Sequence, residues 1–139
     1  MSNTVVWLIT LAVAGTMLGA GTLKLIFTPA KLAADGPPII GRTVFTDLSW
    51  ALDVPAGLVK FIGVAEVLGG IGMVAPALTK ILPILVPIAS VGIAITMLGA
   101  VALHIYRREP WGVLFPGTLL AGAVLVAWAR FGPYPLLAV

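Results

Sequence analysis

The segment KFIGVAEVLGGIGMVAP, residues Lys60–Pro76, decides the fold, because it is apolar enough to lie in lipid and yet carries one acid, Glu66, near its middle. A charged side chain at the centre of a bilayer costs roughly 2.5–3.5 kcal/mol on insertion scales. On a helix, Gly63, Gly69, Gly70 and Met73 lie on or beside the face of Glu66, at offsets of three, four and seven residues. Small residues let neighbouring helices approach closely. We therefore expect Glu66 to point into a helix bundle rather than toward lipid.

The composition of the whole chain is that of an integral membrane protein. Its 139 residues are 60% hydrophobic and only 9% charged, with a mean hydropathy of +1.16, whereas soluble domains are about 25% charged. The chain has no cysteine, which excludes disulfides, thiolate metal sites and thiol nucleophiles. The net charge of +3 comes from few groups and does not indicate nucleic-acid binding. We predict one domain, residues 1–139, whose first helix is retained because MSNTVV lacks the basic segment of a signal peptide.

The hydrophobic segments predict an all-α fold, a bundle of four transmembrane helices. A helix needs about 20 apolar residues to cross a bilayer. The expected helices cover residues 5–27, 55–78, 81–106 and 111–130. The first of them contains Gly15 and Gly19, at the spacing of a common close-packing motif of membrane helices.

One long loop, residues 28–55, is expected between the first two helices. A connection of this length in a small protein is usually functional or a lid. Within it, Thr46 and Asp47 are suitable caps for a short helix that includes Trp50. Trp50 also fits an anchor at the membrane interface.

Several polar residues are expected to meet at one end of the bundle. Because consecutive spans are antiparallel, Lys24, Lys60 and His104 share one side of the membrane, beneath the 28–55 loop. Glu66 lies six residues beyond Lys60, which is roughly 9 Å deeper along the helix. We therefore predict a cavity with Glu66 at its floor. Snorkelling of Lys24 toward the interface is the simpler explanation of that lysine.

Candidate site residues follow from this arrangement. Glu66 is expected to be largely uncharged near pH 7, because a buried carboxylate without a cation loses its hydration, unless Lys24 or His104 reaches it from another helix. We predict Glu66 and His104 as catalytic residues. We predict Lys24, Lys60, Met73 and Trp50 as ligand-binding residues, and no metal ligands.

Three stretches resemble the DoxX-like family of small four-helix membrane proteins. They are Ala14–Leu25, Ile62–Gly69 (IGVAEVLG) and Met97–His104 (MLGAVALH), and the closing Ala127–Arg130 (AWAR) is similar as well. The resemblance covers most of the chain, although the 28–55 loop matches poorly. It implies a four-helix transmembrane bundle, a link to membrane redox complexes, and a role for the acid at Glu66 and the histidine at His104.

Three functions remain open at this point. The first is binding of a quinone-like or other lipophilic small molecule, with membrane redox proteins as partners, in a bacterial cytoplasmic membrane. The second is an acid–base enzyme, such as an isomerase, cyclase or epoxide-opening catalyst, that uses Glu66 and His104 on a lipophilic substrate. The third is an accessory or assembly subunit, or a homo-oligomer, whose glycines face lipid and partner helices. The sequence does not identify a cofactor, and a haem held by His104 alone is a minor alternative.

Overall fold

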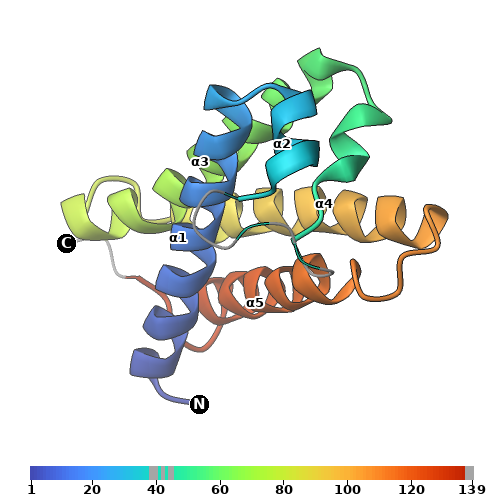
Figure 1. Ribbon diagram of the computed structural model, residues 1–139. Helices are drawn as coiled ribbons and strands as arrows, with labels where there is room; N and C mark the ends of the chain where they lie inside the picture. Colours follow the sequence, from blue (N-terminus) through green and yellow to red (C-terminus); the bar gives the residue numbers. More distant parts are fainter. Residues whose placement is uncertain (38–40, 42, 44–45, 137–139) are drawn as a thin grey trace.

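The computed structural model describes residues 1–37, 41, 43 and 46–136, and over these residues its regular structure is entirely helical (Figure 1). The four long helices are α1 (Asn3–Ile26), α3 (Ala56–Thr79), α4 (Leu85–Tyr106) and α5 (Leu114–Phe131). Two short helices, α2 (Pro29–Asp35) and the 3-10 helix η1 (Ser49–Leu52), lie between α1 and α3. Each of the four long helices is long and apolar enough to cross a membrane. The predicted all-α membrane bundle is therefore confirmed.

The four long helices form a ring in which each packs mainly on two neighbours. α1 packs against α3 and α5, and α4 packs against the same two helices. In Figure 1, α4 and α5 run side by side, and α1 crosses them. The ends of α1 and α4 and the start of α3 form what we call the polar end. The start of α1, the end of α3 and the end of α5 form the far end.

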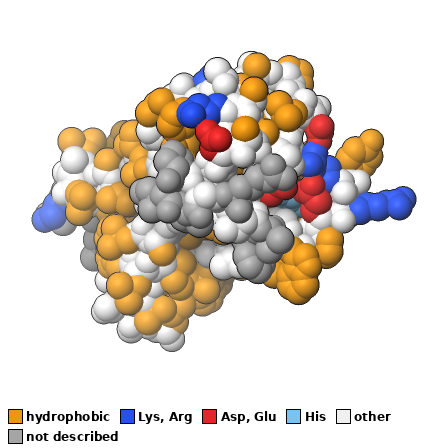
Figure 2. Space-filling view, in the orientation of Figure 1, with side chains coloured by type: hydrophobic (Ala, Val, Ile, Leu, Met, Phe, Trp, Pro, Cys, Tyr) orange, Lys and Arg blue, Asp and Glu red, His pale blue; other side chains and the backbone are white. Residues whose placement is uncertain are grey.

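The outer surface of the ring is apolar, as lipid contact requires. Large hydrophobic side chains are exposed on every long helix, among them Leu8, Phe61, Ile95 and Trp128. Figure 2 shows hydrophobic side chains over much of the lower part of this face, while most charged side chains gather above and at the right margin. Because an exposed apolar surface of this extent is unfavourable in water, the bilayer is the environment that this fold requires.

α1 and α3 approach closely through glycines. A Cβ at Gly21 would lie 2.7 Å from the backbone oxygen of Gly63, and a Cβ at Gly70 would lie 2.9 Å from the backbone oxygen of Ala14. Gly63 and Gly70 are two of the three glycines predicted on or beside the face of Glu66, and the third, Gly69, packs on Ile93 of α4, so their predicted role in helix packing is confirmed. In contrast, a Cβ at Gly15 or Gly19 would meet nothing within 4 Å, and that glycine pair faces outward.

Two helix starts differ from the expected boundaries. α4 begins at Leu85 rather than at 81, because Lys80 and Leu82 have positive φ angles of 59° and 50°. A proline disfavours the helical conformation of the residue before it, and Pro83 follows Leu82. α5 begins at Leu114 rather than at 111.

The prediction of one long loop over residues 28–55 is wrong, because that segment contains α2 and η1. The Thr28 side chain caps α2 by accepting from Lys31 N at 3.3 Å, and Pro29 occupies the first turn, where no N–H is needed. Near η1, the Asp47 side chain accepts from Ser49 N at 2.9 Å. The short helix predicted around Trp50 is thus confirmed.

Candidate functional site

Lys24 and Glu66 form a buried ion pair between α1 and α3. The Lys24 Nζ donates to Glu66 Oε2 at 2.6 Å, and it also lies 3.5 Å from the backbone oxygen of Ala20. Lys24 is 6% exposed and Glu66 is 3% exposed. The close approach at Gly21 and Gly63 brings the two helices near enough for this contact, because a Cβ at either glycine would collide with the other helix.

This pair changes two of the sequence-based expectations. Lys24 does not snorkel toward the interface, because its ammonium points inward to Glu66. The expectation of an uncharged Glu66 assumed that no cation reached it, and the structure supplies one from another helix. The exception allowed for above, a cation that reaches Glu66 from another helix, is therefore the arrangement in this structure.

η1 covers this ion pair from the polar end. The buried ring of Trp50 has its centroid 6.0 Å from Lys24 Nζ, within the range of a cation–π contact. Trp50 packs with Leu32 of α2 and Val59 of α3 in a small apolar cluster. Trp50 is therefore part of a packed cover over Lys24 rather than an anchor exposed at the membrane interface.

Lys60 and Met73 are occupied by contacts within the fold. The Lys60 Nζ donates to the backbone oxygens of Leu25 and Phe27, each at 2.8 Å, and so caps the end of α1. Met73 is fully buried in the central core, where it packs with Met17, Ile93 and Met97 among others. Neither side chain is presented to a ligand in this arrangement.

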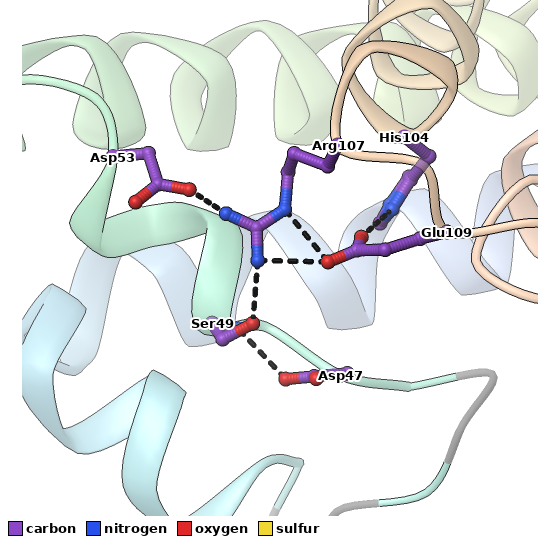
Figure 3. A network of polar contacts seen from close by, with 6 residues as sticks. All are labelled: Asp47, Ser49, Asp53, His104, Arg107 and Glu109. Carbon is purple, nitrogen blue, oxygen red and sulfur yellow. Dashed lines mark hydrogen bonds and ion pairs between the residues drawn. The ribbon is translucent and has the colours of Figure 1, made fainter.

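A second polar cluster centres on Arg107, which follows α4. Its Nη2 donates to Ser49 Oγ at 2.9 Å, its Nε donates to Glu109 Oε1 at 2.8 Å, and Nη1 pairs with Asp53 (Figure 3). Figure 3 shows the guanidinium between the carboxylates of Asp53 and Glu109. Arg107 thus ties both ends of η1 to the turn between α4 and α5.

His104, which is 8% exposed, is the member of this cluster whose ring nitrogens can either donate or accept a hydrogen bond. Its Nδ1 lies 2.7 Å from Glu109 Oε2. A carboxylate held by Arg107 is ionised and accepts only, so Nδ1 carries the hydrogen. In neutral His104 the other nitrogen, Nε2, is then an acceptor. A Cβ at Gly112 would lie 2.6 Å from His104 Nδ1, so the backbone of the α4–α5 turn packs directly on the imidazole.

His104 also lines an open hollow at the polar end. The hollow measures about 200 Å³, and its lining consists of Asp47, His104, Glu109, Pro110, Trp111 and Gly112. Figure 3 shows the imidazole facing the carboxylate of Glu109. A second hollow of about 150 Å³ lies beside α2, lined by Phe27, Lys31, Leu32, Asp35 and Gly36. Neither hollow reaches Glu66, so the predicted cavity with Glu66 at its floor receives no support.

The structure divides the predicted site residues into two groups. Lys24, Glu66 and Trp50 meet in the buried cluster, whereas His104 lies in the Arg107 cluster and opens onto the hollow. Glu109 was not predicted as the partner of His104, nor was the contact of Arg107 with Glu109 and Ser49. The run of three charged residues that begins three positions after His104, Arg107 to Glu109, was the available signal.

Comparison with protein families gives one result. The sequence profile described as the DoxX-like family matches residues 8–126, which include the four long helices almost entirely and both polar clusters. Comparison with curated proteins and with solved structures returns no match.

Proposed function

This chain belongs to the DoxX-like family, and that family relationship implies a link to membrane redox chemistry. We propose that the protein binds a lipophilic molecule of the quinone class at the polar end. The ligand's hydroxyl or carbonyl head lies in the hollow beside His104. The observation that carries the proposal is that this histidine, hydrogen-bonded to Glu109, lines an open hollow at the polar end of the bundle.

The hydrogen bond to Glu109 determines what His104 can recognise. With the hydrogen on Nδ1, neutral imidazole accepts a hydrogen bond at Nε2. A quinol hydroxyl is a suitable donor for that nitrogen. In the protonated imidazole Nε2 donates instead, and a quinone carbonyl is a suitable acceptor for that hydrogen.

The size of the hollow limits which part of the ligand it holds. Pockets that enclose a whole drug-sized ligand measure about 300–1,000 Å³, and this hollow measures about 200 Å³. A single ring is the part that fits, and an apolar tail then lies outside, along the lipid-facing surface. Trp111 lines the hollow and is 60% exposed, which provides an aromatic contact at this boundary.

The Lys24–Glu66 pair supports this site from below rather than contacting the ligand. It lies beneath Trp50 of η1, and η1 is bound to Arg107, which holds Glu109. A shift of η1 would therefore disturb the carboxylate that orients His104. The acid–base enzyme that pairs Glu66 with His104 is less well supported, because each of these residues has a different charged partner.

We also propose a bacterial cytoplasmic membrane as the location, with the polar end facing the cytoplasm. Lys31, Lys60, Arg107 and Arg108 lie at the polar end, whereas Lys80 and Arg130 lie at the far end. The excess of basic residues on one side favours a cytoplasmic position for that side. Quinol-dependent membrane redox proteins are the partners that this location offers.

The test compares a short-chain ubiquinol with its dimethyl ether, which keeps the ring but has no hydroxyl donor. Binding is measured by tryptophan quenching on protein in nanodiscs. The variant His104→Asn retains an N–H near Glu109 and removes Nε2. We expect wild type to bind the quinol at least about fivefold more tightly than the ether, a value that corresponds to one hydrogen bond of about 1 kcal/mol. His104→Asn removes this preference. Equal affinity for both molecules in wild type refutes the proposal.

A second candidate function, an accessory or assembly subunit, is favoured by the outward glycines. Gly15 and Gly19 on α1, and Gly92 and Gly99 on α4, have nothing within 4 Å of an added Cβ. Such faces suit close packing with a partner helix in the membrane. Replacing Gly15 and Gly19 by leucine would abolish cross-linking to a partner protein or to a second copy if this function is correct, and would leave quinol binding unchanged.

A further inference from the structure

Arg130 carries a buried charge at the far end of the bundle that the quinol site does not use. It lies in the last turn of α5 and is only 4% exposed. Its Nη1 donates to Asn3 Oδ1 at 2.8 Å and to the backbone oxygen of Tyr134 at 3.1 Å. The guanidinium also lies over the ring of Trp7, 4.8 Å from its centroid. Contacts from two segments, the start of α1 and the turn after α5, therefore fix its orientation.

Two guanidinium nitrogens of Arg130, Nε and Nη2, are buried without a hydrogen-bond partner among the described residues. These two nitrogens form one edge of the guanidinium. That edge presents two parallel N–H groups, which is the geometry that binds a phosphate or carboxylate bidentately. The orphaned donors are thus a complete recognition edge rather than two unrelated defects.

The charge of Arg130 also has no acidic side chain near it among the described residues. The acids at the polar end are Asp35, Asp47, Asp53 and Glu109, and Glu66 is paired with Lys24 inside the bundle. A buried cation without a counter-charge loses hydration that no partner replaces. A phosphate or carboxylate group is the counter-charge that a guanidinium edge binds best.

We propose that Arg130 binds a phosphate-type oxyanion, supplied by the head group of an anionic phospholipid, through its Nε and Nη2 edge. Trp7 and Asn3 hold the guanidinium in place. The turn after α5 folds back over the site through the hydrogen bond from Tyr134 N to the backbone oxygen of Ala129, at 2.8 Å, and the Tyr134 hydroxyl bonds to the backbone oxygen of Met1. Opening of this turn admits the head group.

The experiment uses delipidated full-length protein in detergent and follows bound lipid by native mass spectrometry. The probes are dioleoylphosphatidylglycerol, dioleoylglycerol, which has the same chains without phosphate, and inorganic phosphate. We expect wild type to bind the phosphatidylglycerol at least about tenfold more tightly than the diacylglycerol, the range of a charge-assisted hydrogen bond. Arg130→Gln abolishes this preference. Arg130→Lys keeps the charge without the two parallel N–H groups and should retain part of the preference for phosphatidylglycerol. Lys80→Gln, at the same end of the bundle, should leave that preference intact.

Three results decide whether Arg130 binds the phosphate of a lipid head group. Equal binding of the two lipids by wild type overturns the proposal, as does an unchanged preference in correctly folded Arg130→Gln. Competition by millimolar inorganic phosphate that is lost in Arg130→Gln supports the oxyanion site and assigns it to a soluble anion rather than a lipid. If Arg130→Gln does not fold, the comparison of wild type with Arg130→Lys decides, and equal preference in those two proteins refutes bidentate recognition.

Discussion

The buried ion pair gives the sharpest stability prediction. Lys24 and Glu66 lie 2.6 Å apart, and both side chains are less than a tenth exposed. Removal of one partner of such a pair leaves an uncompensated buried charge and costs about 3–5 kcal/mol, whereas replacement of both partners by apolar residues is often close to neutral. We expect Lys24→Met and Glu66→Leu each to lower the free energy of unfolding by about 3 kcal/mol, and the double variant to lose less than either single variant.

The assay is reversible unfolding by sodium dodecyl sulfate in mixed micelles, analysed as a double-mutant cycle. The exposed pair of Lys31 and Asp35 on α2, at 2.9 Å, is the matched control. An exposed pair of this kind contributes about 0.3–0.5 kcal/mol, so Lys31→Met should be nearly silent. Additive losses for Lys24→Met and Glu66→Leu would show that the two groups do not interact, and would refute the reasoning.

Two further predictions follow from glycine contacts. Gly21→Ala should destabilise the bundle by about 1–3 kcal/mol in the same unfolding assay, because the new methyl group collides with α3. Gly19→Ala is the control, because its methyl group has no atom within 4 Å and should leave the free energy of unfolding unchanged. Equal effects of the two variants would contradict the close approach of α1 and α3. Gly112→Ala should weaken quinol binding although His104 is intact, because the methyl pushes on Nδ1, while Gly117→Ala in open space should bind normally in the nanodisc assay.

The four helices and the inward direction of Glu66 are predictable from the sequence because both depend on local pattern. Apolar length gives the spans, and glycines at offsets of three and four mark the face of Glu66 that packs on another helix. The start of α4 was predicted four residues too early, because hydropathy does not register the positive φ angles at Lys80 and Leu82.

The partners of the polar residues depend on contacts between helices that the sequence does not encode locally. Lys24 reaches Glu66 because Gly21 and Gly63 set the rotation and separation of α1 and α3. A lysine at a helix end usually extends its ammonium toward the membrane interface. That expectation was wrong for Lys24, whose ammonium points into the bundle. In the same way, the orientation of His104 depends on Arg107, which is positioned by η1 from a distant part of the chain.

The most direct test of the proposed function is photolabelling with an azido-quinone, followed by mass-spectrometric mapping of the labelled peptide. The label should fall within residues 104–112, which include most of the lining of the hollow, and unlabelled ubiquinol should compete for it. His104→Asn should reduce the labelling, whereas Lys60→Met, which removes a backbone cap, should not. A label on α3 near Glu66, or labelling that ubiquinol does not compete away, would contradict the proposal that the ligand head lies beside His104.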